Sequence, residues 1–221
     1  MIILHHLNNS RSQRIIWLLE ELGLTYEIKR YQRNNKTMLA PPELKEIHPL
    51  GKSPVITDGE LVIAESGAII EYLVNKYGNG KLKPNQEKDS LRYTYWLHYA
   101  EGSVMPILIM ALIFKKVETA PMPFFVRPIV KSISATVHKA FITPNIKSHF
   151  DFMEGELNKS TWFTGNEFSA ADIQMSFPIE AASTRGLLLG RPKLQAYLSA
   201  IQARPAYKQA LERGGEYNLD K

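Results

Sequence analysis

The chain has 221 residues, of which 44% are hydrophobic and 22% are charged, as is typical of a soluble globular protein with a buried core. It contains no cysteine, which excludes disulfides, thiolate metal sites and a catalytic thiol of its own. The net charge of +5 comes from scattered residues, and this pattern argues against nucleic-acid binding.

The first 31 residues predict a β-α-β unit. The strand-like stretch "MIILHHL" is followed by the polar loop "NNSRSQR" and by a helix with apolar residues at i, i+3, i+4 and i+7 from Ile15. Gly23 suits the end of this helix, and "TYEIKRY" alternates as a strand does. Because the connection contains a helix, we expect the two strands to be parallel.

The stretch from residue 32 to residue 77 predicts the rest of an α/β domain. A short helix is expected at "PPELKEI", since proline suits a helix start. "PVIT" and "ELVIA" predict two strands joined by a two-residue hairpin at Asp58-Gly59. A helix is expected from about Ser66, which gives the element order β-α-β-α-β-β-α.

A polar stretch rich in helix breakers, Gly78 to Asp89, is the best candidate for a domain boundary. It predicts an N-terminal domain over residues 1–80, a linker over 81–88 and an all-helical domain over 89–221. The first long helix is expected to bend at Gly102 or Pro106, and a second should cover residues 126 to 158. Ser169 and Asp172 match a capping box with Asp in place of Glu, and we expect the loss of Asp172 to cost on the order of 1 kcal/mol or more.

Targeting signals are not indicated. The start "MIILHHLNNS" lacks the basic region and the apolar length of a signal peptide. The longest apolar run, Val104 to Phe114, is too short for a membrane span and contains Pro106. We therefore expect a soluble, cytoplasmic protein that has no membrane partner.

Four stretches, in the expected order, resemble the cytosolic glutathione transferases. They are "NNSRSQR", "HPLGKSPVITDGELVIAESGAIIEYL", the linker, and "FSAADIQMS" after "WFTG". The chain looks most similar to bacterial and fungal members related to the theta and phi types, which place a hydroxyl at the thiol. The resemblance implies an α/β thioredoxin-like N-terminal domain with an all-α C-terminal domain, glutathione as co-substrate, and a homodimer.

The same resemblance implies the contacts to glutathione. Ser53 would offer its backbone N–H and C=O to the cysteinyl part, followed by a cis Pro54. Ser66, at a helix start that suits a carboxylate, would bind the γ-glutamyl carboxylate, and Glu65 the ammonium group. Lys52 could pair with the glycine carboxylate or be an ordinary solvated lysine. Weaker candidates for that last contact lie in the loop after the second strand: Arg33, Asn35 and Lys36.

The polar loop is the expected position of the reactive sulfur. Lowering a thiol pKa by about two units requires about 2.7 kcal/mol, which a hydroxyl hydrogen bond and a helix N-terminus can supply together. Counting back from Arg14, theta-like spacing points to Ser10, whereas phi-like spacing points to Asn9, whose amide can also donate. Arg11 could add positive potential near the sulfur or face solvent. Ser12 is expected to cap the helix.

Metal binding is not indicated, and the second substrate site is expected to be apolar. His5 and His6 are adjacent on a strand and point to opposite faces, so we expect structural roles for both. The electrophile site should lie between the domains. Tyr99 and Met105, in the first helix of the second domain, are candidates for lining it.

These observations predict a glutathione S-transferase that conjugates the glutathione thiolate to hydrophobic electrophiles, as in detoxification. One alternative is a glutathione-dependent peroxidase or disulfide reductase on the same scaffold. Another is a non-enzymatic binding protein that uses the fold as an interaction module, because fold does not determine function. The expected partners are glutathione, a small hydrophobic electrophile and a second copy of the chain.

Overall fold

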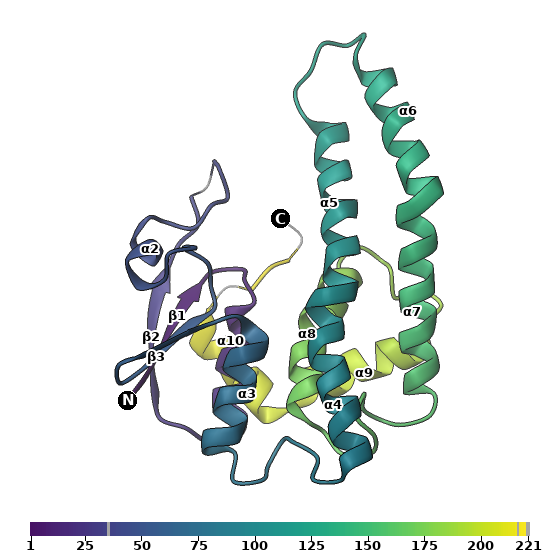
Figure 1. Cartoon of the computed structure of the whole chain (residues 1–221). Helices are drawn as coiled ribbons and strands as arrows, with labels where there is room; N and C mark the ends of the chain where they lie inside the picture. The colour runs from purple at the N-terminus through teal and green to yellow at the C-terminus, as the bar shows by residue number, and fades with distance from the viewer. Residues whose placement is uncertain (35, 216, 220–221) are drawn as a thin grey trace.

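A computed structural model describes residues 1–34, 36–215 and 217–219. A small sheet with flanking helices forms the N-terminal domain, and a bundle of longer helices stands beside it (Figure 1). The predicted order β-α-β-α-β-β-α is the order found in the first domain.

The sheet of the N-terminal domain is mixed, with strand order β2-β1-β3-β4. β1 and β2 are parallel, as predicted from the helical connection between them, and β3 is antiparallel to both of its neighbours. The strands are β1 (Ile2–Leu7), β2 (Tyr26–Tyr31), β3 (Val55–Asp58) and β4 (Leu61–Ala64).

Helix α1 follows the predicted pattern: Ile15, Leu18 and Leu19 are fully buried, and Leu22, just after the helix, is partly buried. The helix ends as expected at Gly23, whose φ of +65° is the left-handed conformation that glycine adopts at a helix C-terminus. The backbone N–H of Leu24 then donates to the carbonyl oxygen of Leu19 at 3.1 Å. The helices of this domain are α1 (Ser12–Glu21), α2 (Glu43–Ile47) and α3 (Ser66–Tyr77).

The hairpin between β3 and β4 differs from the prediction by one residue. Asp58 pairs with Leu61, so the two linking residues are Gly59 and Glu60 instead of Asp58 and Gly59. The reason lies in the side chain of Asp58, whose Oδ2 accepts hydrogen bonds from the hydroxyl of Tyr72 at 2.7 Å and from the Nζ of Lys76 at 2.9 Å. These contacts with α3 hold Asp58 inside the strand.

The helical domain contains the two predicted long helices, and a π-helical segment interrupts each of them. In the first, the π-helical segment η1 separates two α-helices and contains Gly102, one of the two predicted bend positions. Figure 1 shows α5 and α6 projecting together beyond the other elements. The first long helix is α4 (Glu87–Tyr99), η1 (Ala100–Val104) and α5 (Met105–Thr119); the second is α6 (Arg127–Val137), η2 (His138–Ile142) and α7 (Thr143–Leu157).

The continuous helix from Glu87 to Thr119 has a mean hydropathy of 1.6 over its most apolar stretch, enough for a membrane span by length and composition alone. In the fold, however, Met105, Ile107 and Leu108 of this helix are buried within the protein. In all, 39% of that apolar stretch is buried inside the protein.

Helix α8 (Ala170–Ser183) runs through the centre of the helical domain and is almost entirely buried. The predicted capping box at its start is confirmed: the N–H of Ser169 donates to the carboxylate of Asp172 at 2.9 Å. The same carboxylate accepts the N–H of Phe163 at 3.0 Å, and burial raises the pKa of Asp172 to about 7. The last helices are α9 (Pro192–Ala203) and α10 (Pro205–Gly214).

Candidate functional site

Two cavities of similar size meet at the side chain of Arg11. The first, of about 280 Å³, is called the polar cavity here. The second, of about 230 Å³, is called the apolar cavity. Arg11 lines both, so one guanidinium group marks the junction between them. All five residues predicted to bind glutathione line the polar cavity: Lys52, Ser53, Pro54, Glu65 and Ser66.

The loop before β3 brings Ser53 and Pro54 to the edge of the sheet. The bond between them is cis, as the resemblance implied. The hydroxyl of Ser53 donates to the backbone oxygen of His5 at 2.8 Å and accepts the N–H of Leu7 at 3.2 Å. The side chain therefore holds this loop against β1.

Glu65 and Ser66 lie at the start of α3 in different environments. Glu65 is exposed and has a φ of +69°, a left-handed conformation that is unfavourable for a residue with a Cβ and that recurs at binding sites. Ser66 is buried and is the first residue of the helix, where backbone N–H groups lack partners within the helix. The pair thus offers a carboxylate next to an anion-binding helix end.

Arg14 holds the side chain of Ser66 in place through a hydrogen bond, and the sequence did not predict this role. Its NH2 group donates to the hydroxyl of Ser66 at 2.5 Å, and its NH1 group donates to the backbone oxygen of Gln174 at 2.7 Å. Arg14 is buried although it is charged. One signal was available in the sequence: Arg14 precedes Leu18 by four residues and so lies on the buried face of α1.

Glu101 extends from η1 of the helical domain into the polar cavity and forms ion pairs with Arg11 and Arg14. The contact from the Nε of Arg11 to the carboxylate is 2.8 Å. Burial alone would raise the pKa of Glu101, but the two guanidinium groups hold it below its usual value. Nothing local in "YAEGSV" indicated this role, because both partners come from the other domain.

Ser12 was predicted to cap α1 and Ser10 to contact the sulfur, but the structure shows other contacts for both side chains. Ser12 does not cap α1, because the helix begins at Ser12 itself. The oxygen of Ser10 accepts the N–H of Ser12 at 3.2 Å, and the two hydroxyl oxygens are 2.7 Å apart. The hydroxyl of Ser12 lies 2.8 Å from the Nδ1 of His6. This neighbour on β1 draws the Ser12 side chain away from the helix end.

The three residues predicted to act on sulfur are placed differently. Ser10 is buried in the contacts with Ser12 and is not among the described residues that line either cavity. Asn9 lines the apolar cavity, and its Oδ1 accepts the backbone N–H of Asn218 at 2.7 Å. Arg11 reaches both cavities, and its guanidinium group lies over the ring of Phe177 at 4.8 Å.

The two predicted electrophile contacts are also placed differently. Met105 lines the apolar cavity together with Leu108 and other residues of α5. Tyr99 is buried in an aromatic cluster with Trp96, and its hydroxyl lies 2.6 Å from the Nδ1 of His149. Tyr99 is not among the described residues that line the cavity.

The loop after β2 contributes one cation to the site. Arg33 lines the apolar cavity instead of the polar one. Lys36 is exposed and lines neither cavity among the described lining residues, whereas Asn35 lies outside the described part of the chain.

His5 and His6 point to different partners, as their positions on a strand predict. The Nδ1 of His5 lies 2.9 Å from the hydroxyl of Tyr31, while His6 contacts Ser12. Burial, followed by the charge of Arg30, lowers the pKa of His6 to about 4, so its ring is neutral near pH 7. Within the described residues, no group of three or more His, Asp and Glu side chains could hold a metal ion.

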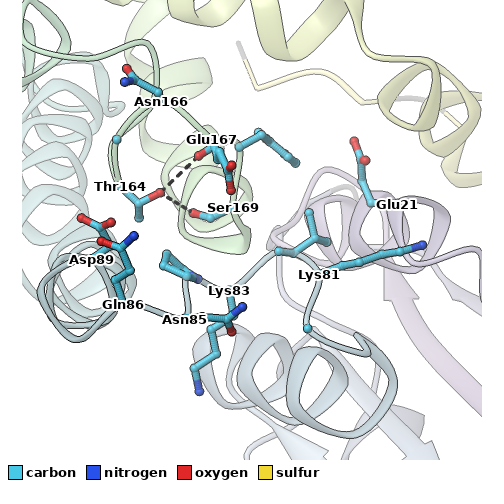
Figure 2. A pocket seen from close by; sticks show the side chains of 15 residues that line it. Glu21, Lys81, Lys83, Asn85, Gln86, Asp89, Thr164, Asn166, Glu167 and Ser169 are labelled. Atoms are coloured by element: carbon cyan, nitrogen blue, oxygen red, sulfur yellow. Dashed lines mark hydrogen bonds between the residues drawn. The ribbon is translucent and has the colours of Figure 1, made fainter.

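A third cavity, of about 660 Å³, lies where the linker meets the turn before α8 (Figure 2). In that turn Thr164 donates to the hydroxyl of Ser169 at 3.1 Å. Lys81 and Lys83 of the linker line the cavity together with the acidic residues Glu21, Asp89 and Glu167. It contains none of the predicted site residues, so its size does not make it the functional site.

Known proteins resemble this chain in sequence and in fold. The chain matches the family models "Glutathione S-transferase, N-terminal domain" over residues 1–75 and "Glutathione S-transferase, C-terminal domain" over residues 120–205. It is 37% identical to glutathione S-transferase 3 of Schizosaccharomyces pombe, over 96% of this chain and 88% of that protein. Glutathione S-transferase 1 of Saccharomyces cerevisiae is 34% identical, over 96% of this chain and 95% of that protein. A crystal structure of a glutathione S-transferase from Actinobacillus pleuropneumoniae has a TM-score of 0.78 and 35% identity, covering 100% of this chain and 95% of that one.

Proposed function

Because the chain belongs to the glutathione S-transferase family, we propose that it conjugates the glutathione thiolate to hydrophobic electrophiles. The predicted fold, a thioredoxin-like domain followed by a helical domain, is confirmed by the same matches. The observation that carries the proposal is the meeting of the polar and apolar cavities at Arg11. One cavity suits a peptide with charged ends, the other suits an apolar reactant, and the junction is where they would react.

Glutathione lies extended in the polar cavity. Its γ-glutamyl carboxylate meets Ser66 and the N-terminus of α3, and its ammonium group meets the exposed carboxylate of Glu65. The backbone of Ser53 pairs with the cysteinyl part, and Lys52 with the glycine carboxylate. The lining of the polar cavity supports this arrangement, because it holds two cations, Lys52 and Arg11, and two acids, Glu65 and Glu101.

Arg11 provides the main stabilisation of the thiolate. A thiolate at the junction of the cavities lies against its guanidinium group, and an opposite charge within about 4–6 Å lowers a pKa by about one to three units. Ser10 keeps the loop in place through Ser12, and Asn9 forms the nearby wall of the apolar cavity. In a substitution, the sulfur forms a bond to carbon, the leaving group departs with the bonding electron pair, and the thiol proton has already gone to solvent.

The chain acts as a cytoplasmic homodimer. An exposed apolar patch on the first helices of the second domain supports this proposal. Leu91 and Tyr95 on α4 are 73% and 47% exposed, and Phe152 on α7 is 40% exposed. The rings of Tyr95 and Phe152 lie 6.4 Å apart, so the patch is continuous.

Calorimetric titration with glutathione, followed by rate measurements with chlorodinitrobenzene and with cumene hydroperoxide, tests the proposal. We expect binding at millimolar glutathione or below and faster turnover of the chlorinated compound. Replacing Glu65 with Ala should weaken glutathione binding by about tenfold, since a charged hydrogen bond contributes roughly 1.5–3 kcal/mol. Glu60→Ala, in the exposed β3–β4 turn, is the matched control. If the unaltered protein did not bind glutathione, the proposed transferase activity would be refuted. Faster turnover of the hydroperoxide than of the chlorinated compound would favour a peroxidase.

A further inference from the structure

The two cavities differ sharply in charge. The apolar cavity is lined by four cations, Arg11, Arg33, Lys116 and Arg185, and by no Asp or Glu among the described residues. The polar cavity, by comparison, balances two cations with two acids. An apolar wall that carries several positive charges and no negative one is unusual for a site meant only for neutral molecules.

The guanidinium group of Arg33 donates its hydrogen bonds to neutral groups. Its guanidinium donates to the backbone oxygens of Asn8 at 3.2 Å and of Met38 at 3.0 Å. No carboxylate of the described residues lies within ion-pair distance of it. Burial, and then the charge of Arg11, lowers its pKa, yet an arginine remains protonated near pH 7. Its positive charge is therefore not compensated within the described part of the chain.

Arg185 and Lys116 repeat this pattern from the helical domain. Arg185 follows α8, and its NH1 group donates to the backbone oxygen of Leu108 on α5 at 3.2 Å. Lys116 lies on α5, two turns beyond Leu108, and is exposed. Across the described residues, neither forms an ion pair, whereas Arg11 is paired with Glu101. Among the described residues, three cations without an ion-pair partner thus line the cavity, Arg33 from the first domain and Arg185 and Lys116 from the second.

Arg33 is half-buried, and a partly desolvated positive charge is costly unless an anion compensates for it, whereas Arg185 and Lys116 are exposed. Positive charges also draw anions into a cleft with low-dielectric walls. We infer that the apolar cavity selects amphiphilic anions, compounds with an apolar body that bear a carboxylate or sulfonate group. The inference rests on the proposed function, since it specifies the electrophile of the same site. The apolar body contacts Met105, Leu108 and Phe177, and the anionic group meets Arg33, Arg185 and Lys116.

A matched pair of electrophiles measures this selectivity. Chlorodinitrobenzoate, with its chlorine between the two nitro groups, and its methyl ester react at the same carbon, where a C–S bond forms and chloride leaves with the bonding pair. We expect kcat/KM to favour the acid over the ester. Arg185→Gln and Arg33→Gln should each lower the acid-to-ester ratio about tenfold, the effect of one charge-assisted hydrogen bond. Arg127→Gln removes an exposed cation that does not line the described cavity, and it should leave the ratio unchanged.

A binding measurement separates this inference from the proposed function. Anilinonaphthalene sulfonate is an apolar anion whose fluorescence reports binding without glutathione, and N-phenylnaphthylamine is its neutral counterpart. Arg185→Gln should weaken binding of the sulfonate about tenfold relative to the neutral dye, and added salt should reduce the difference. This result supports the inference even if no conjugation is found. Equal effects on both dyes, or a change confined to the KM for glutathione, would overturn it. Circular dichroism of each variant shows whether a loss of binding reflects misfolding.

Discussion

The NH2 group of Arg14 donates a hydrogen bond of 2.5 Å to the hydroxyl of Ser66, although 52 residues separate them in the chain. The contact joins the first helix to the start of α3, where a glutathione carboxylate is proposed to bind. Because Arg14 also pairs with Glu101, the same side chain connects the binding surface to the helical domain. The orientation of Ser66 therefore depends on a residue outside the cavity.

We expect Arg14→Met to raise the KM for glutathione and to lower the free energy of unfolding by about 1–3 kcal/mol. The stability loss arises because the buried hydroxyl of Ser66 and the backbone oxygen of Gln174 lose a charged donor, while Glu101, which is half-buried, keeps Arg11 as its partner. Urea unfolding and initial rates at varied glutathione measure the two effects. Arg92→Met, which breaks the ion pair with Glu156 away from both cavities, is the control, and an equal KM change in that variant would contradict the assignment.

Arg11, more than Ser10, should set the pKa of bound glutathione. We expect Arg11→Gln to raise the thiol pKa in the complex by about one unit or more, because a nearby positive charge is lost. Ser10→Ala removes the acceptor for the N–H of Ser12 and should cost about 1 kcal/mol of stability with a smaller pKa change. Ultraviolet titration of the thiolate measures the pKa change in each of the two variants. A larger pKa change in Ser10→Ala would return the main role to the serine.

Tyr217 should control the apolar cavity from a distance. Its hydroxyl donates to Glu180 at 2.8 Å, and two residues further on Leu219 lines the cavity. We expect Tyr217→Phe to raise the KM for the electrophile several-fold and to leave the KM for glutathione nearly constant. Tyr207→Phe is a matched control, since Tyr207 donates to the same carboxylate from α10, and it should not reproduce the effect. Equal changes in the KM for the electrophile in both variants would indicate that this KM depends on the environment of Glu180 and not on the position of Leu219.

The burial of His6 predicts a specific pH dependence of stability. Its pKa in the folded protein is about 4, below the ordinary value of 6.5. The folded state therefore binds fewer protons between these values, and the stability present above pH 6.5 is lost as the pH falls towards 4. The loss attributable to this residue is about 3 kcal/mol. Urea midpoints at pH 7 and pH 4.5 should differ less in His6→Gln than in the unaltered protein. Thr94→Gln, at an exposed position on α4 that does not titrate, is the control and should not change the difference.

Local patterns in the sequence predicted the elements well. The spacing from Ile15 placed α1, and Ser169 with Asp172 placed the start of α8. These patterns depend on neighbours within one or two turns, which a sequence displays directly. The domain limits at residues 80 and 89 stay predictions, and α4 begins at Glu87, inside the predicted linker.

Contacts between distant segments could not be predicted in the same way. Ser12 was expected to cap α1, but His6 on the neighbouring strand draws its hydroxyl away. Tyr99 was expected at the electrophile site, yet its hydroxyl finds His149 instead, 50 residues along the chain. Glu101 showed no local sign of pairing with α1. In each case the partner is brought near only by the packing of another element.

The π-helical segment η1 also changes the phase of the helix that contains it. A π turn takes up more residues than an α turn, so apolar positions spaced for one side of α4 no longer continue along α5. The side chain that falls at this step is Glu101, which leaves the buried face and meets the arginines of α1. The widened turn thus lets one continuous helix present an aromatic face to the core along α4 and line the apolar cavity along α5, with Glu101 between the two parts.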